Sequence, residues 1–312
     1  RAPYIDFVLG TRNISKIKDV VDKKGSVEIS IDNDDSQYEF AIANNNNFRT
    51  SVNISVGCDK ECTYCIVPST RGDEISIPPE MIVSQIQKAV DNGVVEVALL
   101  GQNVNSYGKR FSNNADKYSF TQLLQDISKI DGLKRIRFTS PHPLHMDDEF
   151  IEEFARNPKI SKCIHMPLQS GSTKILKAMK RGYTKEWFLN RAFKMRELIP
   201  DLRITTDIIV AFPGETHEDF LDTLDVVNQV KFDQIFNFKY SPRPNTKALE
   251  LKDLEIEDSI GSARLDELIE LHKRYLENSM PNMIGKTVNV LDESLKPNGE
   301  VSGYTDNYFL VF

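Results

Sequence analysis

The sequence predicts an α/β protein in which parallel strands alternate with helices. Between residues 51 and 250, apolar runs typical of strands alternate with amphipathic segments typical of helices, in six steps. Polar or glycine-rich loops follow these runs, at the strand ends where parallel α/β folds place their chemistry. The uniform order of strand and then helix favours a partial (β/α)6 barrel of the TIM type, with smaller segments at both ends of the chain.

Composition excludes several classes of protein. The chain has 312 residues, of which 40% are hydrophobic and 27% charged, as in ordinary soluble proteins. No apolar run approaches the roughly 18 residues of a membrane span, so a membrane role is not expected. Four cysteines, three of them clustered, indicate a reducing cytoplasm. The net charge of −7 argues against broad electrostatic attraction to nucleic acid, so RNA binding requires a local basic surface.

The first fifty residues divide into two segments. Residues 1–21 predict an alternating strand up to Gly10 and a short helix from Ile14 to Val21. Residues 22–50 are rich in Lys, Asp, Asn, Ser and Gly, which is typical of a linker. Within this linker, residues 27–31 and 38–43 alternate like the strands of a hairpin.

Residues 51–250 are predicted to form the barrel. The first helix begins at Pro78 and Pro79, and Ile82, Ile86 and Val90 share one of its faces. The continuous apolar run 94–100 is typical of a strand buried on both sides. The strands are predicted at 52–56, 94–100, 135–139, 164–168, 204–211 and 234–240, and the helices at 78–91, 121–130, 147–155, 172–179, 185–198 and 217–230.

Two further segments follow the barrel. Residues 251–283 contain a predicted helix at 258–278, whose leucines indicate that it packs outside the barrel and links it to the tail. Residues 284–312 change to short alternating stretches, at 287–291 and 308–312, which predict a small β domain.

A compact group of cysteines follows the first strand of the barrel. Cys58, Cys62 and Cys65 lie within eight residues, so three thiolates of one loop can reach a single metal site. Disulfides would require an oxidising compartment and an even cysteine framework. A structural zinc site would need a distant fourth ligand, such as Cys163 or a histidine. Three thiolates can instead hold three irons of a [4Fe–4S] cluster and leave the fourth iron open for a ligand that reacts.

The cysteine pattern resembles the signature of radical S-adenosylmethionine (SAM) enzymes, whose open iron binds the amino and carboxylate groups of SAM. Its surroundings resemble the methylthiotransferase family, and within it the MiaB type. The resemblance runs over nearly the whole chain, and its motifs lie at residues 71–72, 100–108, 139–143, 166–172, 206–216 and 240–243.

The resemblance implies a six-unit barrel, a [4Fe–4S] cluster on Cys58, Cys62 and Cys65, and reductive cleavage of SAM to a 5′-deoxyadenosyl radical. It implies that this radical attacks C2–H of N6-isopentenyladenosine beside the tRNA anticodon and that the base becomes its 2-methylthio derivative. The partners implied are tRNA and an electron donor such as flavodoxin or ferredoxin, acting on a cytoplasmic monomer.

The two ends of the chain resemble parts of further domains. Residues 1–21 resemble the end of an N-terminal methylthiotransferase domain, whose earlier part holds three more cysteines and a second [4Fe–4S] cluster. Residues 284–312 resemble the start of a TRAM domain, a small RNA-binding β-barrel, and with 29 residues they are too short to close one. Both ends are therefore expected to be truncated.

Seven residues are candidates for binding SAM, and each also has an ordinary structural role open to it. An aromatic ring beside the last cysteine can stack on adenine, and amides after the second strand can bond the methionine amino group. Other side chains at strand ends can reach the ribose hydroxyls or the carboxylate. A guanidinium suits that carboxylate, and a carboxylate within an apolar strand needs partners. The candidates, in that order, are Tyr64, Gln102, Asn103, Ser140, Gln169, Arg181 and Asp207.

A basic and aromatic group follows the last strand of the barrel. Lys239, Tyr240, Arg243 and Lys247 are candidates for contact with RNA phosphates or bases. The five histidines have no metal-ligand spacing and are expected at the surface or behind the site. Cys163 is expected to be a small core residue.

Two other functions stay open. The same chemistry can act on threonylcarbamoyl-adenosine of tRNA or on an aspartate of a ribosomal protein, although the run from Gly101 to Gly108 favours the isopentenyl-adenosine type. The chain can also be a non-catalytic iron–sulfur or zinc protein that binds RNA, which predicts a filled fourth coordination position and no SAM binding.

Overall fold

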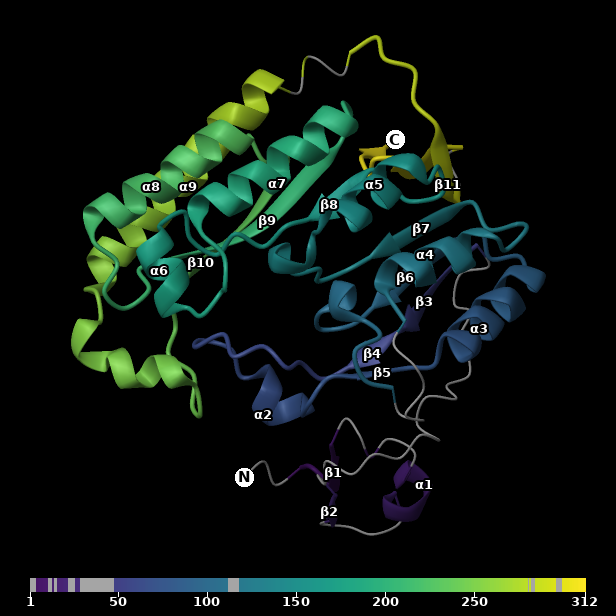
Figure 1. Ribbon diagram of the computed structural model, residues 1–312, viewed down its shortest axis with the longest axis horizontal. Helices are drawn as coiled ribbons and strands as arrows, with labels where there is room; N and C mark the ends of the chain where they lie inside the picture. Colours follow the sequence, from purple (N-terminus) through teal and green to yellow (C-terminus); the bar gives the residue numbers. More distant parts are fainter. Residues whose placement is uncertain are drawn as a thin grey trace.

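The computed structural model describes residues 4–10, 13, 16–21, 26–28, 48–111, 118–279, 281, 284–295 and 299–312. Most of these residues form one body in which helices surround strands that run parallel to one another (Figure 1). A small antiparallel sheet from the C-terminal segment lies against this body.

Six parallel strands form close to the predicted positions, and they divide into two sheets. The neighbours are β3-β6-β7 in the first sheet and β8-β9-β10 in the second. The α/β class is thus confirmed, whereas one continuous barrel sheet is not. The strands are β3 (Arg49–Asn53), β6 (Glu96–Leu100), β7 (Arg135–Phe138), β8 (Cys163–His165), β9 (Arg203–Val210) and β10 (Gln234–Lys239).

The division between the sheets has a local cause. The segment beside β7 is 159–161, because Ile136 N donates to Lys159 O at 2.7 Å and Ser161 N donates to Ile136 O at 3.0 Å. This segment comes before β8, which spans only three residues and pairs with β9. The residues that pair with β7 are therefore not those of β8, and the contact between the two sheets is a single bridge between Ile136 and Ile160.

Seven helices form where the sequence predicts them, with ends that shift by at most two residues. Side-chain caps explain several starts: Ser119 and Gln122 form a capping box, and so do Thr216 and Asp219. Ile82 and Ile86 are fully buried in the main core, as their helical spacing predicts. The helices are α3 (Pro79–Asp91), α4 (Phe120–Ser128), α5 (Asp148–Arg156), α6 (Thr173–Ala178), α7 (Lys185–Leu198), α8 (His217–Val230) and α9 (Asp258–Ser279).

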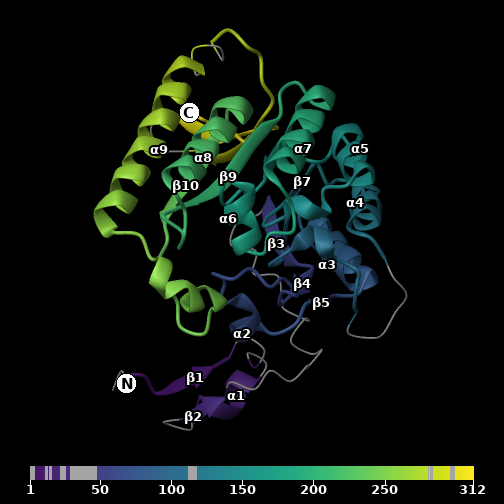
Figure 2. The same cartoon turned by 60° about the vertical axis from the view of Figure 1, so that its left-hand side comes forward.

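Helix α9 packs on the outside of the second sheet. It lies alongside α8 and β10 in both views (Figures 1 and 2). Leu268 is fully buried there, and the predicted outer position of this helix is confirmed. None of the helices in the described residues is both long enough and apolar enough to cross a membrane.

The N-terminal part has short elements. Strand β1 (Phe7–Leu9) pairs in parallel with β2 (Ser26–Glu28), and α1 (Ile17–Val20) lies between them in sequence. Strand β2 falls inside the segment predicted as a linker. The predicted strand at 38–43 lies outside the described residues.

The C-terminal sheet lies at the amino ends of the parallel strands. It consists of β11 (Val290–Leu295), β12 (Val301–Thr305) and β13 (Leu310–Val311). Arg135, at the start of β7, donates to Tyr304 O at 3.1 Å and pairs with Asp306 at 3.0 Å. The guanidinium of Arg137 lies 3.5 Å from the centroid of the Tyr308 ring. This contact leaves the carboxyl ends of the strands uncovered by the small sheet.

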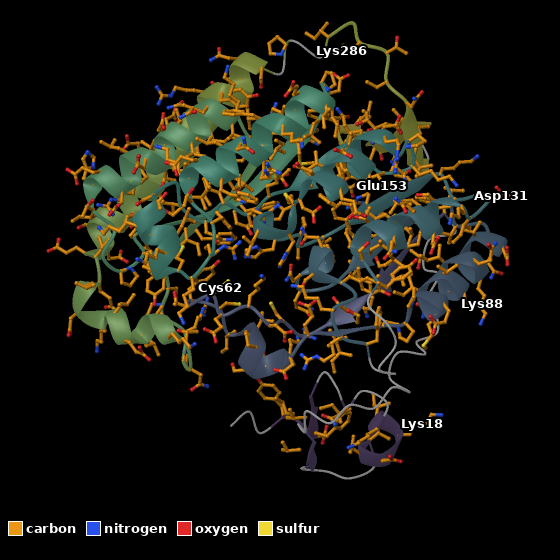
Figure 3. The ribbon with its side chains drawn as sticks, in the orientation of Figure 1. Lys18, Cys62, Lys88, Asp131, Glu153 and Lys286 are labelled. Atoms are coloured by element: carbon orange, nitrogen blue, oxygen red, sulfur yellow. The ribbon has the colours of Figure 1, made fainter. Side chains whose placement is uncertain are left out.

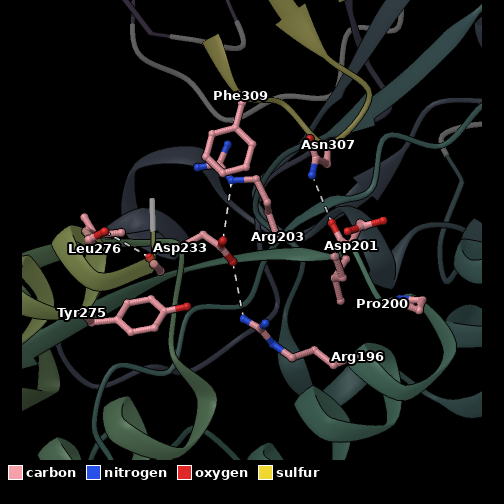
Figure 4. A pocket seen from close by; sticks show the side chains of 11 residues that line it. Arg196, Pro200, Asp201, Arg203, Asp233, Tyr275, Leu276, Asn307 and Phe309 are labelled. Carbon is pink, nitrogen blue, oxygen red and sulfur yellow. Dashed lines mark hydrogen bonds and ion pairs between the residues drawn. The ribbon is translucent and has the colours of Figure 1, made fainter. Parts of the chain in front are cut away.

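A pocket of about 410 Å³ lies beside this contact, between α7, α9 and the loop before β13 (Figure 4). Arg196 and Arg203 approach Asp233 from two sides, at 3.4 and 3.9 Å. The Asp233 carboxylate balances part of this positive charge. Arg203 begins β9, so the pocket lies at the amino ends of the strands, opposite the cysteine loop.

Candidate active site

The three clustered cysteines lie in a loop after β4 (Ser55–Val56), which pairs with β5 (Ile75–Ser76). Backbone bonds hold the loop from two sides: Cys58 N donates to Gly72 O at 3.1 Å, and Thr63 N donates to Met179 O at 3.2 Å. Met179 directly follows α6, so the loop bridges the two halves of the molecule; Figure 3 labels Cys62 within it.

The loop begins with a turn that only glycine fits. Gly57 has a φ of +80°, and a Cβ built on it would lie 2.0 Å from the carbonyl oxygen of Asp73. Its N–H donates to Oε1 of Gln102 at 2.7 Å. Gln102, predicted to bind SAM, therefore uses its amide oxygen to hold the entry of the cysteine loop.

The three thiols are half-buried, and all four cysteines of the chain are free. Burial raises the pKa of the Cys58 thiol to about 11 and also raises that of Cys65. No three His, Cys, Asp or Glu side chains within the described ranges converge closely enough to hold one metal ion. Thiolates that each bind a different iron of a cluster do not need such convergence, and three sulfur donors in one loop fit a cluster.

Arg181 contacts the cysteine loop directly. Its side chain is 5% exposed, and Nη1 donates to Sγ of Cys62 at 3.2 Å. Nε donates to the Tyr183 hydroxyl at 3.1 Å, and Nη2 donates to Pro167 O at 3.2 Å. Each guanidinium nitrogen makes one of these bonds, which uses three of the five N–H groups, so a SAM carboxylate could reach only the two N–H groups that remain.

Buried polar atoms without a protein partner lie beside the loop. Asn103 is 2% exposed; its Nδ2 lies 3.5 Å from Oε2 of Glu74, and its Oδ1 has no hydrogen-bond partner. The second carboxylate oxygen of Glu74 also lacks one, and burial raises the pKa of this group. Because buried polar atoms are normally satisfied, these oxygens favour a polar ligand at this position.

Three residues that follow parallel strands have left-handed backbone conformations. Ser140 after β7, Gln169 after β8 and Ala211 after β9 have φ values of 55°, 69° and 58°. Ser140 is exposed, while Gln169 is buried and exchanges backbone bonds with Asp207 and Ile209. Strained backbone collects at functional sites, which supports the predicted role of this edge. Ala211 lies within the 206–216 motif, but the sequence analysis did not single it out as a site residue.

Asp207 finds its partner on the neighbouring strand. Its carboxylate lies 3.2 Å from Nε2 of His165, whose other ring nitrogen lies 2.9 Å from Oγ1 of Thr205. The prediction that this carboxylate needs a partner is confirmed. The partner, His165, was expected at the surface or behind the site because the histidines have no metal-ligand spacing. The Asp207 side chain is half-buried.

Tyr64 packs in a small apolar cluster. Its half-buried ring lies against a group formed by Ile175, Met179, Phe212 and Ala248. Burial raises the pKa of its hydroxyl, so the ring stays neutral. Tyr64 is part of the cysteine loop, and this apolar packing is enough to explain a tyrosine there. Its contact with adenine remains a prediction.

The predicted RNA-binding residues do not form one free basic patch. Lys239 pairs with Asp258 of α9 at 2.6 Å, and Lys247 pairs with Glu61 of the cysteine loop at 3.2 Å. Tyr240 contacts Phe212 edge to face, with ring centroids 5.3 Å apart. Arg243 is exposed and forms no ion pair with any residue that the structure describes.

Two histidines were missed as part of this edge. His142 is buried, His145 is half-buried, and Nε2 of each lacks a partner. Burial lowers the pKa of both imidazoles, to about 3 for His145, so both are neutral at physiological pH. The Thr139–Pro143 motif placed His142 at a strand end. The histidines were judged by metal-ligand spacing, which gives no information on burial.

The fourth cysteine lies apart from this site. Cys163 begins β8, at the amino-terminal edge of the sheets, and its side chain is half-buried rather than fully in the core. Burial raises the pKa of its thiol.

Comparisons with known proteins agree with this geometry. Residues 52–227 match the radical SAM superfamily. The tRNA-2-methylthio-N(6)-dimethylallyladenosine synthase of Aliarcobacter butzleri is 80% identical over the whole chain, which covers 72% of that protein. Synthases of the same name from a Nitratiruptor species and from Campylobacter jejuni are 57% and 56% identical, again over 100% of this chain and 72% of theirs.

Solved structures show the fold at low identity. The radical SAM methyltransferase TsrM of Kitasatospora setae, with cobalamin and a [4Fe–4S] cluster, superposes with a TM-score of 0.52 and 17% identity, over 64% of this chain and 38% of that one. Coproporphyrinogen III oxidase (HemN) of Escherichia coli, described as a radical SAM enzyme, gives 0.50 and 14%, over 73% and 52%. The α/β arrangement is therefore that of radical SAM proteins.

Proposed function

The chain belongs to the MiaB-type tRNA methylthiotransferases of the radical SAM superfamily, and we propose that Cys58, Cys62 and Cys65 hold its [4Fe–4S] cluster with one iron open to SAM. The observation that supports this most is a loop with three free thiols, one of which accepts a hydrogen bond from a buried guanidinium. A bound cluster supplies the electron that splits SAM, while the protein binds, orients and excludes water.

The residues around the loop divide the work of binding SAM. The unpaired Oδ1 of Asn103 accepts from the methionine amino group, because an amide oxygen can do so without adding charge. Ser140 and Gln169, after β7 and β8, would reach the ribose or the carboxylate, and Asp207, held by His165, would offer a further carboxylate oxygen. Tyr64 would stack on the adenine of SAM. Gln102 is assigned to the loop, since its oxygen already binds Gly57.

The two parallel sheets form the halves of one partial six-unit barrel, joined at residues 136 and 160. Their order follows the chain, and their carboxyl ends meet at the cysteine loop, which supports this arrangement. Residues 1–21 are the end of an N-terminal domain, 22–50 a linker, 51–250 the barrel, 251–283 the linking helix, and 284–312 the start of a TRAM-like domain.

We infer that the substrate is N6-isopentenyladenosine next to the anticodon of tRNA; the relatives' names, which specify 2-methylthio-N(6)-dimethylallyladenosine in tRNA as the product, support this. A base in a single-stranded loop can be splayed into a site at the strand ends. A second [4Fe–4S] cluster that delivered the sulfur would be held outside these 312 residues, because the remaining cysteine, Cys163, begins β8 at the opposite edge. An electron donor such as flavodoxin or ferredoxin would supply the electron that a bound cluster passes to SAM.

Nucleoside analysis tests this function. The reduced 312-residue chain is expected to convert SAM to 5′-deoxyadenosine, and the longer protein is expected to place a methylthio group on tRNA that contains N6-isopentenyladenosine. Activity only on tRNA with threonylcarbamoyl-adenosine would favour the alternative substrate. Methylthiolated tRNA made by the 312-residue chain would contradict the proposed second cluster.

Arg243→Ala is expected to weaken tRNA binding. Arg243 is exposed in the loop after β10 and forms no ion pair with a described residue. Loss of one phosphate contact makes the slope of log affinity against log salt shallower by about one unit or slightly less. Binding measured over several salt concentrations gives this slope.

Arg274→Ala on α9 removes the same charge from an exposed position elsewhere and serves as the control. Both variants should keep SAM cleavage without tRNA. An unchanged slope for Arg243→Ala, equal to that of the control, would mean that the RNA contacts lie on other surfaces such as the C-terminal sheet.

A further inference from the structure

Arg181 is a buried cation without a carboxylate partner among the described residues. The contrast is Arg264, also buried, whose Nη1 lies 2.7 Å from Oε2 of Glu215. The guanidinium of Arg181 instead donates to the Tyr183 hydroxyl, the carbonyl of Pro167 and Sγ of Cys62. Burial raises the pKa of Tyr183, which keeps its hydroxyl neutral. A buried charge needs compensation, and of the three groups that accept its hydrogen bonds only the Cys62 sulfur belongs to the proposed cluster ligands.

The position of this guanidinium is fixed by groups on both sides. Arg181 N donates to Leu176 O at 2.9 Å, which anchors its backbone to α6. The Tyr183 hydroxyl lies 2.9 Å from Pro167 O and 3.1 Å from Leu168 O, so it holds Nε from the end of β8. These contacts hold the Nη1 donor so that it points at the cysteine loop.

Each thiol of the loop has its own donor. The backbone N–H of Lys60 bonds Cys58, and the backbone N–H of Val67 bonds Cys65. Among the residues that the structure describes, a charged side chain donates to Cys62 but to neither of the other two thiols. Hydrogen bonds to ligand sulfurs are among the determinants of iron–sulfur reduction potentials, and charge-assisted bonds are roughly twice as strong as neutral ones.

We propose that Arg181 tunes the reduction potential of the cluster by donating to the Cys62 thiolate, instead of binding the SAM carboxylate as the sequence predicted. This role rests on the proposed cluster at Cys58, Cys62 and Cys65. The reduced cluster has one more negative charge than the oxidised one, so a fixed donor stabilises the reduced form and raises the potential. Arg181 is thus a positioning and tuning residue, which acts through a ligand of the cluster.

A redox titration of the reconstituted protein, followed by electron paramagnetic resonance, tests this role. Arg181→Gln is expected to lower the ratio of reduced to oxidised cluster about tenfold at a fixed potential, which is a shift of about 59 mV for one electron. Arg181→Lys keeps the charge but not the planar donor, so a smaller shift in the same direction is expected.

Lys180→Gln is the matched control, because it removes a positive charge from the adjacent residue. Lys180 is exposed and pairs with Glu61 at 2.9 Å, without a bond to any cysteine. Its potential should equal that of the wild type. Equal shifts in Lys180→Gln and Arg181→Gln would overturn the proposal, because charge alone would then explain the effect. Identical potentials in the wild type and Arg181→Gln would also overturn it.

The iron content separates this proposal from the proposed function. A wild-type protein that takes up no iron contradicts the cluster itself, whereas intact clusters of equal potential contradict only the role of Arg181. If Arg181→Gln fails to fold or to take up iron, Tyr183→Phe decides. This variant keeps Arg181 but removes the acceptor of Nε, so a small downward shift supports the proposal and an unchanged potential overturns it.

Discussion

Cys62→Ala is expected to abolish both the iron–sulfur cluster and the cleavage of SAM. The reconstituted wild-type chain should contain about four irons, as a cysteine-ligated [4Fe–4S] cluster does. Removal of one of three thiolates leaves two irons without protein ligands, and the loop offers no replacement sulfur. Iron content should fall close to zero, and 5′-deoxyadenosine formation should fall to the background rate. Cys58→Ala and Cys65→Ala should behave alike.

Cys163→Ala is the control for this experiment, because it removes a half-buried thiol from the start of β8 and not from the loop. It should keep the wild-type iron content. Loss of metal in Cys163→Ala as well would indicate a fourth protein ligand and return the structural zinc interpretation. Tight zinc without iron in the wild type would contradict the radical mechanism.

Gly57→Ala is expected to have the second largest effect. The added Cβ would lie 2.0 Å from Asp73 O and 2.6 Å from Gly72 O, and backbone carbonyls cannot move aside as a side chain can. The positive φ adds its own cost. We expect a loss of at least about 3 kcal/mol in the free energy of unfolding, measured in urea, and poor uptake of iron.

Gly299→Ala separates the two contributions. Gly299 has nearly the same φ, 83°, but a Cβ there meets no atom within 4 Å. Only the conformational cost remains, which is about 1 kcal/mol. If Gly57→Ala costs no more than Gly299→Ala and takes up iron normally, the turn at the entry of the cysteine loop does not position the cluster.

Local sequence patterns predicted the elements well. Helix α3 begins at Pro79 and buries Ile82 and Ile86, because proline favours the first helical turn and a spacing of four residues keeps side chains on one face. Strand β6 lies inside the run 94–100, where the apolar side chains are mostly buried, as expected for a strand covered on both sides. These features depend on residues that are neighbours in the sequence.

Long-range pairings were beyond the same patterns. Arg181 was recognised as a cation after a helix end, but its partner Cys62 is 119 residues away, so the sequence could not indicate which anion it meets. Lys247 was expected to be free for RNA, yet Glu61 lies 186 residues earlier and pairs with it. The break between β7 and β8 likewise depends on which residues of a later segment face β7.

Electron–nuclear double resonance on the reduced cluster, with SAM labelled by ¹⁵N in its amino group, tests the central claim most directly. If one iron of the cluster has no protein ligand and binds the SAM amino group, the wild type should show a hyperfine coupling to the label. Absence of that coupling, with a fourth protein ligand seen in its place, would contradict an open iron and favour a non-catalytic iron–sulfur protein.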